Sequence, residues 1–102
     1  MCAVTGCSER AVLRASHIKP WRKADNRERL DGANGFLLVA NLDSLFDNGL
    51  ISFDDEGQML TSKKLKKKNH EKLGIGGTIR RSLSAEHKRY LDYHRKHIFQ
   101  IE

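Results

Sequence analysis

Apolar and polar residues alternate in short runs along this chain, and such runs predict short strands and helices rather than one long element. Residues 11–18 are an apolar run compatible with a strand, which Pro20 then ends because proline cannot donate to a strand ladder. Residues 36–40 are a second apolar run of strand length. Residues 22–35 between them are polar, charged and glycine-containing, which indicates a loop or a loop with a short helical turn. We expect the two strands to be antiparallel neighbours, joined by a loop long enough to suggest a functional segment.

The segment after the second strand has helical signals and then strand signals. Residues 41–49 predict a short helix, with Asn41 suited to the N-cap and Gly49 suited to the position just past the end. Residues 50–62 alternate on both sides of a DDEG turn. That alternation indicates a β-hairpin.

The last third of the chain is less regular until its end. Residues 63–74 are rich in lysine and fit either a helix or a solvated loop. Residues 82–100 carry apolar positions at broadly helical spacing, and Ser84 suits the N-cap. This pattern predicts a C-terminal helix. The fold class is therefore α+β.

Length and charge narrow the class of protein. A chain of 102 residues forms one domain with a modest core, either alone or as the C-terminal module of a longer protein. Nineteen Lys and Arg against thirteen Asp and Glu give a formal net charge of +6, which favours a polyanionic partner such as nucleic acid. No apolar run approaches the length of a membrane span, and the N-terminus lacks the layout of a signal peptide. We expect a soluble, intracellular (cytoplasmic) protein that is not bound to a membrane.

The two cysteines, Cys2 and Cys7, lie close together in the sequence. A reducing cytosol disfavours a disulfide, and two thiols supply half of the ligands that a structural zinc site takes. We favour the simpler interpretation, in which both are small, mostly apolar side chains. A zinc site would need histidines or a second chain to complete it.

Two carboxylates and one histidine could meet beside the first predicted helix. Asp43 and Asp47 are four residues apart, so they lie on one side of that helix, close enough to share a cation. They border its apolar stripe without belonging to it. His17, at the end of the first predicted strand, could reach the same place.

The chain resembles HNH nucleases of the ββα-metal group over about its first sixty residues. The stretches that carry the resemblance are CAVTG, ASHIKPW, ERLDGANGFLL and NLDSLFDNGLISFDDEG. The resemblance implies a ββα-metal core, here with an additional β-hairpin and a C-terminal helix, and divalent-metal-dependent hydrolysis of phosphodiester bonds in DNA. It implies that His17 is the general base that activates water, that Asn34 orients this histidine or its loop, and that Asp43 and Asp47 are the metal ligands.

The sequence departs from the family pattern at two positions. The last histidine of the HNH triplet would fall at or beside Leu42, which cannot bind a metal, and the adjacent Asp43 is at a suitable spacing to replace it. Many relatives have Asp or His immediately before the base, where this chain has Ser16. Oxygen ligands with several waters suit Mg²⁺ or Mn²⁺ better than Zn²⁺. If the metal lies elsewhere, His94 and His97 are the next candidates.

Basic residues surround the predicted base in the sequence. Five of them are expected to hold the DNA backbone electrostatically: Lys19, Arg22, Lys23, Arg27 and Arg29. The resemblance implies that the partner is DNA, and a homodimer is compatible with the sequence without following from it.

Each candidate residue also has a purely structural interpretation. A histidine at a strand end can be simply packed, Asn34 before a glycine is a common turn residue, and Asp43 and Asp47 can be surface charges of a short helix. Two functions follow. One is a metal-dependent endonuclease, acting alone or as the cutting module of a restriction or mobile-element enzyme. The other is a non-catalytic nucleic-acid-binding domain that kept the fold with a degenerate site.

Overall fold

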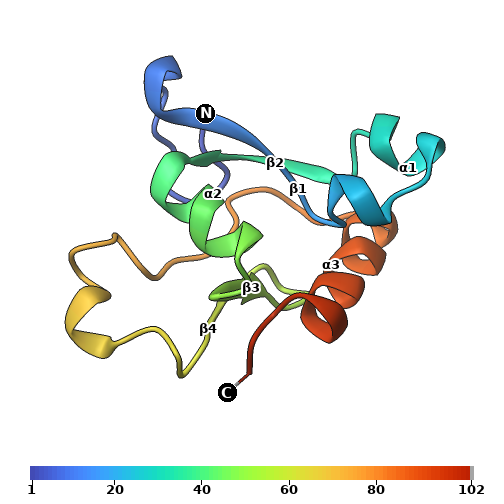
Figure 1. Cartoon of the computed structure of the whole chain (residues 1–102). Coiled ribbons are helices and arrows are strands. Elements are labelled where there is room, and N and C mark those ends of the chain that lie inside the picture. The colour runs from blue at the N-terminus through green and yellow to red at the C-terminus, as the bar shows by residue number, and fades with distance from the viewer. Residues whose placement is uncertain (102) are drawn as a thin grey trace.

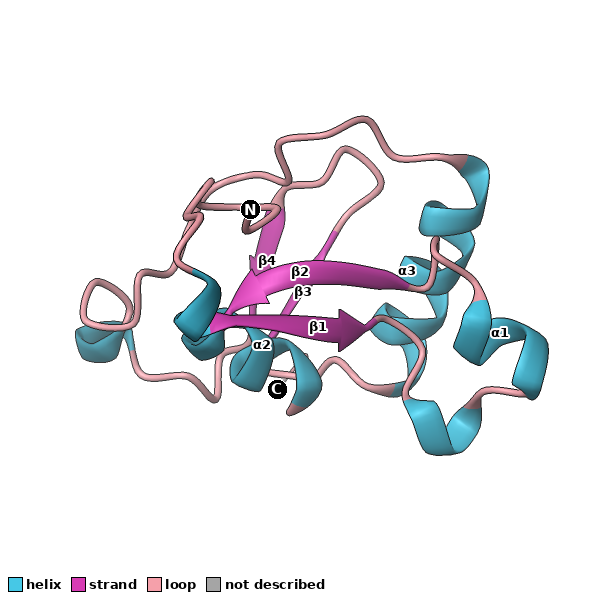
Figure 2. Ribbon diagram, turned by 90° about the horizontal axis from the view of Figure 1, so that it is seen from above, coloured by secondary structure: helices cyan, strands magenta, loops and turns pink. Residues whose placement is uncertain are grey.

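The computed structural model describes residues 1–101 and contains two small antiparallel sheets with helices around them (Figure 1). Its strands pair as β1 with β2 and β3 with β4. The strands are β1 (Leu13–His17), β2 (Gly35–Val39), β3 (Ile51–Phe53) and β4 (Met59–Thr61), and the α-helices are α1 (Asn26–Leu30), α2 (Ala40–Asp47) and α3 (Ala85–His97). Short 3₁₀ turns occur at η1 (Arg10–Val12), η2 (Trp21–Lys23) and η3 (Lys67–Asn69). The strands of one sheet run across those of the other (Figure 2).

The first sheet places the predicted base at its end. β1 and β2 are antiparallel, as expected, and their register runs from Leu13 opposite Val39 to His17 opposite Gly35. β1 is shorter than the predicted 11–18 because its N-terminal residues form the turn η1 instead. Since side chains alternate between the two faces of a strand, His17 lies on the opposite face from the buried Ser16.

Helix α2 follows β2 directly, and this corrects the prediction for its N-cap. Val39, the last residue of β2, is the N-cap, and its side chain makes no capping hydrogen bond. Asn41 is therefore inside the first turn rather than before it. Because the chain passes from strand to helix without a turn, the position before the helix is occupied by a β-strand residue. The acidic Asp43 in the first turn offsets part of the missing cap, since carboxylates favour helix N-termini.

Gly49 ends α2 as predicted, and the end of the chain packs against it. Gly49 has φ +73°, a conformation that other residues rarely adopt, and a Cβ there would collide with the carbonyl oxygen of Ile98. The backbone N–H of Gln100 donates to the carbonyl of Gly49 at 2.8 Å. The C-terminal segment is thus fixed to the end of α2.

The expected hairpin segment, 50–62, contains β3 and β4, paired antiparallel. Of the lysine-rich segment 63–74, only η3 is regular, so the loop alternative describes it better than the helix. Helix α3 begins after Ser84, whose side chain accepts a hydrogen bond from the backbone N–H of His87. In return, the Nδ1 of His87 accepts a hydrogen bond from the backbone N–H of Ser84 at 3.1 Å, so the pair forms a capping box in which an imidazole replaces the usual Glu or Gln.

Three phenylalanines form the centre of the core. Phe36 of β2 lies with its ring centre 6.5 Å from that of Phe46 of α2 and 6.2 Å from that of Phe53 of β3, while Phe46 and Phe53 are 5.6 Å apart. The tilted and edge-on contacts are those that aromatic pairs prefer. Leu91 of α3 is fully buried in the same cluster. The core therefore joins both sheets, α2 and α3 into one body.

Within residues 1–101, no helix is both long enough and apolar enough to cross a membrane.

Candidate active site

Asn34 holds the backbone that follows the predicted base. It is almost completely buried, and its Oδ1 accepts a hydrogen bond from the backbone N–H of Lys19 at 2.7 Å. Its Nδ2 donates to the carbonyl oxygens of Lys19 (3.3 Å) and Glu28 (3.2 Å). Its own carbonyl accepts from the N–H of Ile18, the residue after His17, at 3.3 Å. Asn34 thus fixes the backbone that follows β1 relative to α1.

Lys19 is held by an ion pair rather than left free. Its Nζ contacts both carboxylate oxygens of Glu28 at 3.0 and 2.9 Å, and both side chains are more than four-fifths buried. The pKa of Glu28 is lowered, first by the hydrogen bond from the backbone N–H of Asp25 and then by Lys19. The ammonium also lies 4.9 Å from the ring centre of Tyr93 in α3, a cation–π contact. The segment after His17 is therefore attached to both α1 and α3.

His17 itself is half-buried and contacts an exposed tryptophan. The ring centres of His17 and Trp21 are 5.6 Å apart in an edge-on arrangement, and Trp21 is 56% exposed. The guanidinium of Arg29 lies 4.6 Å from the ring centre of Trp21, and its Nε donates to the Trp21 carbonyl at 2.8 Å. His17, Trp21 and Arg29 thus form a row at the surface, with the imidazole at one end.

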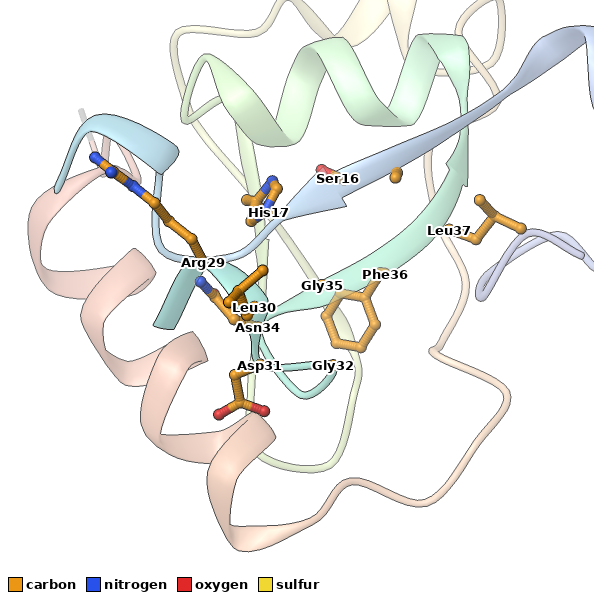
Figure 3. A pocket seen from close by; sticks show the side chains of 11 residues that line it. Ser16, His17, Arg29, Leu30, Asp31, Gly32, Asn34, Gly35, Phe36 and Leu37 are labelled. Carbon is orange, nitrogen blue, oxygen red and sulfur yellow. The ribbon is translucent and has the colours of Figure 1, made fainter. Parts of the chain in front are cut away.

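A hollow of about 330 Å³ opens beside His17, which we call the His17 hollow (Figure 3). It lies along the end of the first sheet and the loop that precedes β2, and it is lined by Ala15, Ser16, His17, Arg29, Leu30, Asp31, Gly32, Asn34, Gly35, Phe36 and Leu37. In this loop, Asp31 accepts hydrogen bonds from the backbone N–H of Ala33 (2.9 Å) and from the Tyr90 hydroxyl (2.8 Å), which lower its pKa. The wall next to the imidazole is therefore anchored to α3.

Asp43 and Asp47 both belong to α2, one helical turn apart. Asp43 is half-buried and Asp47 is exposed, so both carboxylates reach solvent. Leu42, the residue of α2 before Asp43, is fully buried and belongs to the core. Residues 1–101 contain no group of three or more His, Cys, Asp and Glu side chains placed to hold a metal ion. A cation on this helix would thus take two carboxylates from the chain and the rest of its ligands from water.

A second hollow of about 450 Å³, the Asp47 hollow, lies at the C-terminal end of α2. Its lining comes from η2 and from the ends of α2 and α3, and consists of Pro20, Trp21, Arg22, Asp47, Asn48, His97 and Ile98. Trp21 therefore contacts His17 and also lines the hollow that contains Asp47.

His94 and His97 of α3, the alternative candidates for metal binding, have different surroundings. His94 is 1% exposed; its Nε2 donates to the Phe46 carbonyl at 2.8 Å, and its Nδ1 accepts from the Ser52 hydroxyl at 2.8 Å. A carbonyl can only accept, so Nε2 carries the proton of the neutral ring and Nδ1 is its acceptor. Burial lowers the pKa of His94 to about 4. Both nitrogens are occupied, so His94 offers no lone pair to a metal, whereas His97 is exposed and lines the Asp47 hollow.

The N-terminal cysteines line neither of the two hollows. Cys2 is fully buried and Cys7 is half-buried, and neither is in a disulfide. The Sγ of Cys2 accepts a hydrogen bond from the backbone N–H of Thr5 at 3.4 Å. Their environment agrees with a packing role.

Comparison with protein families shows to which family this chain belongs. The family model described as HNH endonuclease matches residues 2–54. The chain belongs to the HNH endonuclease family. Comparison with curated proteins gave no significant match. The matched HNH region includes β1, α1, β2, α2 and β3, while β4 and α3 lie outside it.

Several residues around the HNH region were not found by reading the sequence. Trp21, Tyr90 and Tyr93 contact the segments on either side of His17, and Asp31 anchors the loop before Asn34. Trp21 could have been singled out as the only tryptophan, beside the only proline. Tyr90 and Tyr93 are among the apolar positions of the predicted C-terminal helix, and nothing in their local pattern indicates a partner more than fifty residues earlier in the chain.

Proposed function

We propose that this HNH protein is a metal-dependent DNA endonuclease in which His17 is the general base that activates water for attack on a phosphodiester. The observation that carries this proposal is the pair of hydrogen bonds between the Asn34 side chain and the backbone of Lys19, two residues after His17. Both residues lie within the region that matches the family. A general base must stay within reach of one water, and a fixed backbone limits where the imidazole can point.

The chain's own residues have distinct tasks in this proposal. The neutral imidazole of His17 takes the proton of the attacking water. Asn34 orients the base indirectly, through the backbone of the following residues. Trp21 packs against the imidazole and limits its rotation.

Asp43 and Asp47 would hold the divalent cation, and their hard carboxylate oxygens, with several waters, fit Mg²⁺ or Mn²⁺ better than Zn²⁺. When bound, such a cation supplies Lewis-acid stabilisation of the charge that develops on the phosphate and on the leaving oxygen.

The DNA backbone would be held by basic residues near the base. Arg22, Lys23 and Arg27 are exposed, and Arg29 is half-buried beside Trp21. Lys19 was expected to join them, but its ammonium is already paired with Glu28, so we assign it the task of fixing the loop. Binding through the remaining four cations should weaken steeply with salt.

A plasmid-nicking assay tests the proposal. Supercoiled DNA should be nicked or linearised in the presence of Mg²⁺ or Mn²⁺, and excess EDTA should stop the reaction. Lys88, exposed on α3, provides a control, since Lys88→Gln should cleave at the parent rate. Intact plasmid after incubation with protein at high concentration and either metal would refute nuclease activity.

A non-catalytic DNA-binding domain is the second candidate. It is favoured by Leu42 at or beside the family's last histidine position and by the two-carboxylate set available on α2. Under this alternative the protein would shift a labelled DNA duplex equally well with metal and with EDTA, and it would leave the plasmid intact.

A further inference from the structure

The Asp47 hollow contains donors that the fold does not use. Within residues 1–101, neither Arg22 nor His97 takes part in an ion pair. Trp21, on the same wall as Arg22, exposes more than half of its surface. An arginine fork, an imidazole and an aromatic surface around one hollow form a set that suits a phosphate with its attached sugar or base.

His97 packs against a tyrosine of the same helix. The ring of Tyr93 packs against His97, with ring centres 4.5 Å apart, and Tyr93 also lies under the ammonium of Lys19. The end of α3 is therefore connected to the segment that follows His17. His97 and Ile98, which line this wall, lie outside the residues that the family model matches.

Two residues that line the hollow connect it to the proposed reaction centre. Trp21 lines it and touches His17, with ring centres 5.6 Å apart. Asp47, one of the two proposed metal ligands, lines it as well. A group bound there would be the next neighbour of the group under attack.

We propose that the Asp47 hollow binds the DNA phosphate next to the scissile one, with Arg22 and His97 as its donors and Trp21 against the adjoining sugar or base. This inference rests on the proposed function, because it takes DNA as the substrate. It assigns to the C-terminal helix a direct contact with the substrate.

The carboxylate in the hollow couples this subsite to the metal. Without a cation, Asp47 places a negative charge beside the incoming phosphate and opposes binding. A divalent cation held by Asp43 and Asp47 would cancel this negative charge, so metal and DNA should strengthen each other's binding. Replacing Asp47 by the isosteric asparagine should therefore raise the affinity for DNA in the absence of metal.

The test compares Arg22→Gln and His97→Gln with a matched control. Lys96→Gln removes one positive charge next to His97, but Lys96 is 67% exposed and paired with Asp92 rather than lining the hollow. Binding of a short fluorescein-labelled duplex is followed by anisotropy with Mn²⁺, in a His17→Ala background that prevents cleavage. We expect the dissociation constant to rise about tenfold for Arg22→Gln and severalfold for His97→Gln, against less than twofold for Lys96→Gln.

Salt dependence and the removal of the Asp47 charge complete the test. Arg22→Gln should lower the slope of log K against log salt by about one, the value for one lost phosphate contact. In EDTA, Asp47→Asn should bind the duplex at least about threefold more tightly than the parent, and adding Arg22→Gln should cancel the gain. Arg22→Gln and His97→Gln matching Lys96→Gln would overturn the subsite, as would Asp47→Asn without effect.

The subsite and the nuclease proposal can fail separately. A protein that cleaves plasmid while both hollow variants behave like Lys96→Gln loses the subsite and keeps the nuclease. A protein that never cleaves, but binds DNA with the predicted losses, keeps the subsite as a DNA contact.

Discussion

Acidification should destabilise this protein through His94. Burial lowers the pKa of this imidazole from its usual 6.5 to about 4. Between these two values the unfolded chain binds a proton that the folded chain does not, so folding stability rises with pH and is lost as the pH falls below 6.5. The structural cause is clear: a protonated ring could no longer accept from Ser52, and its charge would lie in a site that is 1% exposed.

The size of the effect follows from the two pKa values. One pKa unit corresponds to about 1.4 kcal/mol, so the full contribution is about 3 kcal/mol, of which about 2 kcal/mol is lost between pH 7 and pH 5. His87 adds to the loss in the same direction, because burial lowers its pKa too. Stopping at pH 5 leaves most of the carboxylate titration outside the measured window.

Urea denaturation followed by circular dichroism at pH 7, 6 and 5 measures this loss. His94→Gln should reduce the loss between pH 7 and pH 5 by about 2 kcal/mol, although it is less stable at pH 7. Ile51→Val is the control: it removes one buried methyl group, costs about 1 kcal/mol at every pH, and keeps the full pH dependence. A parent protein whose unfolding free energy changes by less than about 0.5 kcal/mol over this range would refute the reasoning.

Further predictions concern the loop, the metal and the end of α2. Asn34→Ala should lower the unfolding free energy by about 2 kcal/mol and slow cleavage. Asn34→Asp keeps the Oδ1 acceptor but turns the Nδ2 donor into an acceptor that faces the carbonyls of Lys19 and Glu28, so it should lose at least as much; chemical denaturation and initial rates check both. Asp43→Ala and Asp47→Ala should each lose Mn²⁺ binding in calorimetric titration together with cleavage, and Zn²⁺ should give the parent little activity. Gly49→Ala should destabilise by at least about 1 kcal/mol in urea, whereas Gly32→Ala, whose Cβ would meet nothing within 4 Å, should be nearly neutral.

Local signals in the sequence predicted much of the framework. The antiparallel β1–β2 pair, the helix carrying Asp43 and Asp47, and its end at Gly49 all depend on patterns a few residues long. The error at Asn41 arose because a good capping residue was present there, whereas the strand ended one residue earlier than predicted, so that Val39 became the N-cap and the helix began at Ala40.

The contacts that build the site from distant segments could not be predicted in this way. Tyr90 bonds to Asp31, and His94 bonds to Ser52 and Phe46, across 42 to 59 residues of sequence. These pairs are specified by how α3 packs on the core, and no spacing rule within the sequence contains that information. The same packing brings the end of α3 into the hollow that contains a predicted metal ligand.

The most direct test of the central claim is the single-turnover cleavage rate of His17→Ala measured beside its metal affinity. Removal of a general base typically costs about 10²- to 10⁴-fold in rate. We expect a loss of that size at saturating Mn²⁺, with Mn²⁺ affinity and the unfolding free energy close to those of the parent. A His17→Ala protein that cleaves within a few-fold of the parent rate would contradict the assignment of His17 as the base.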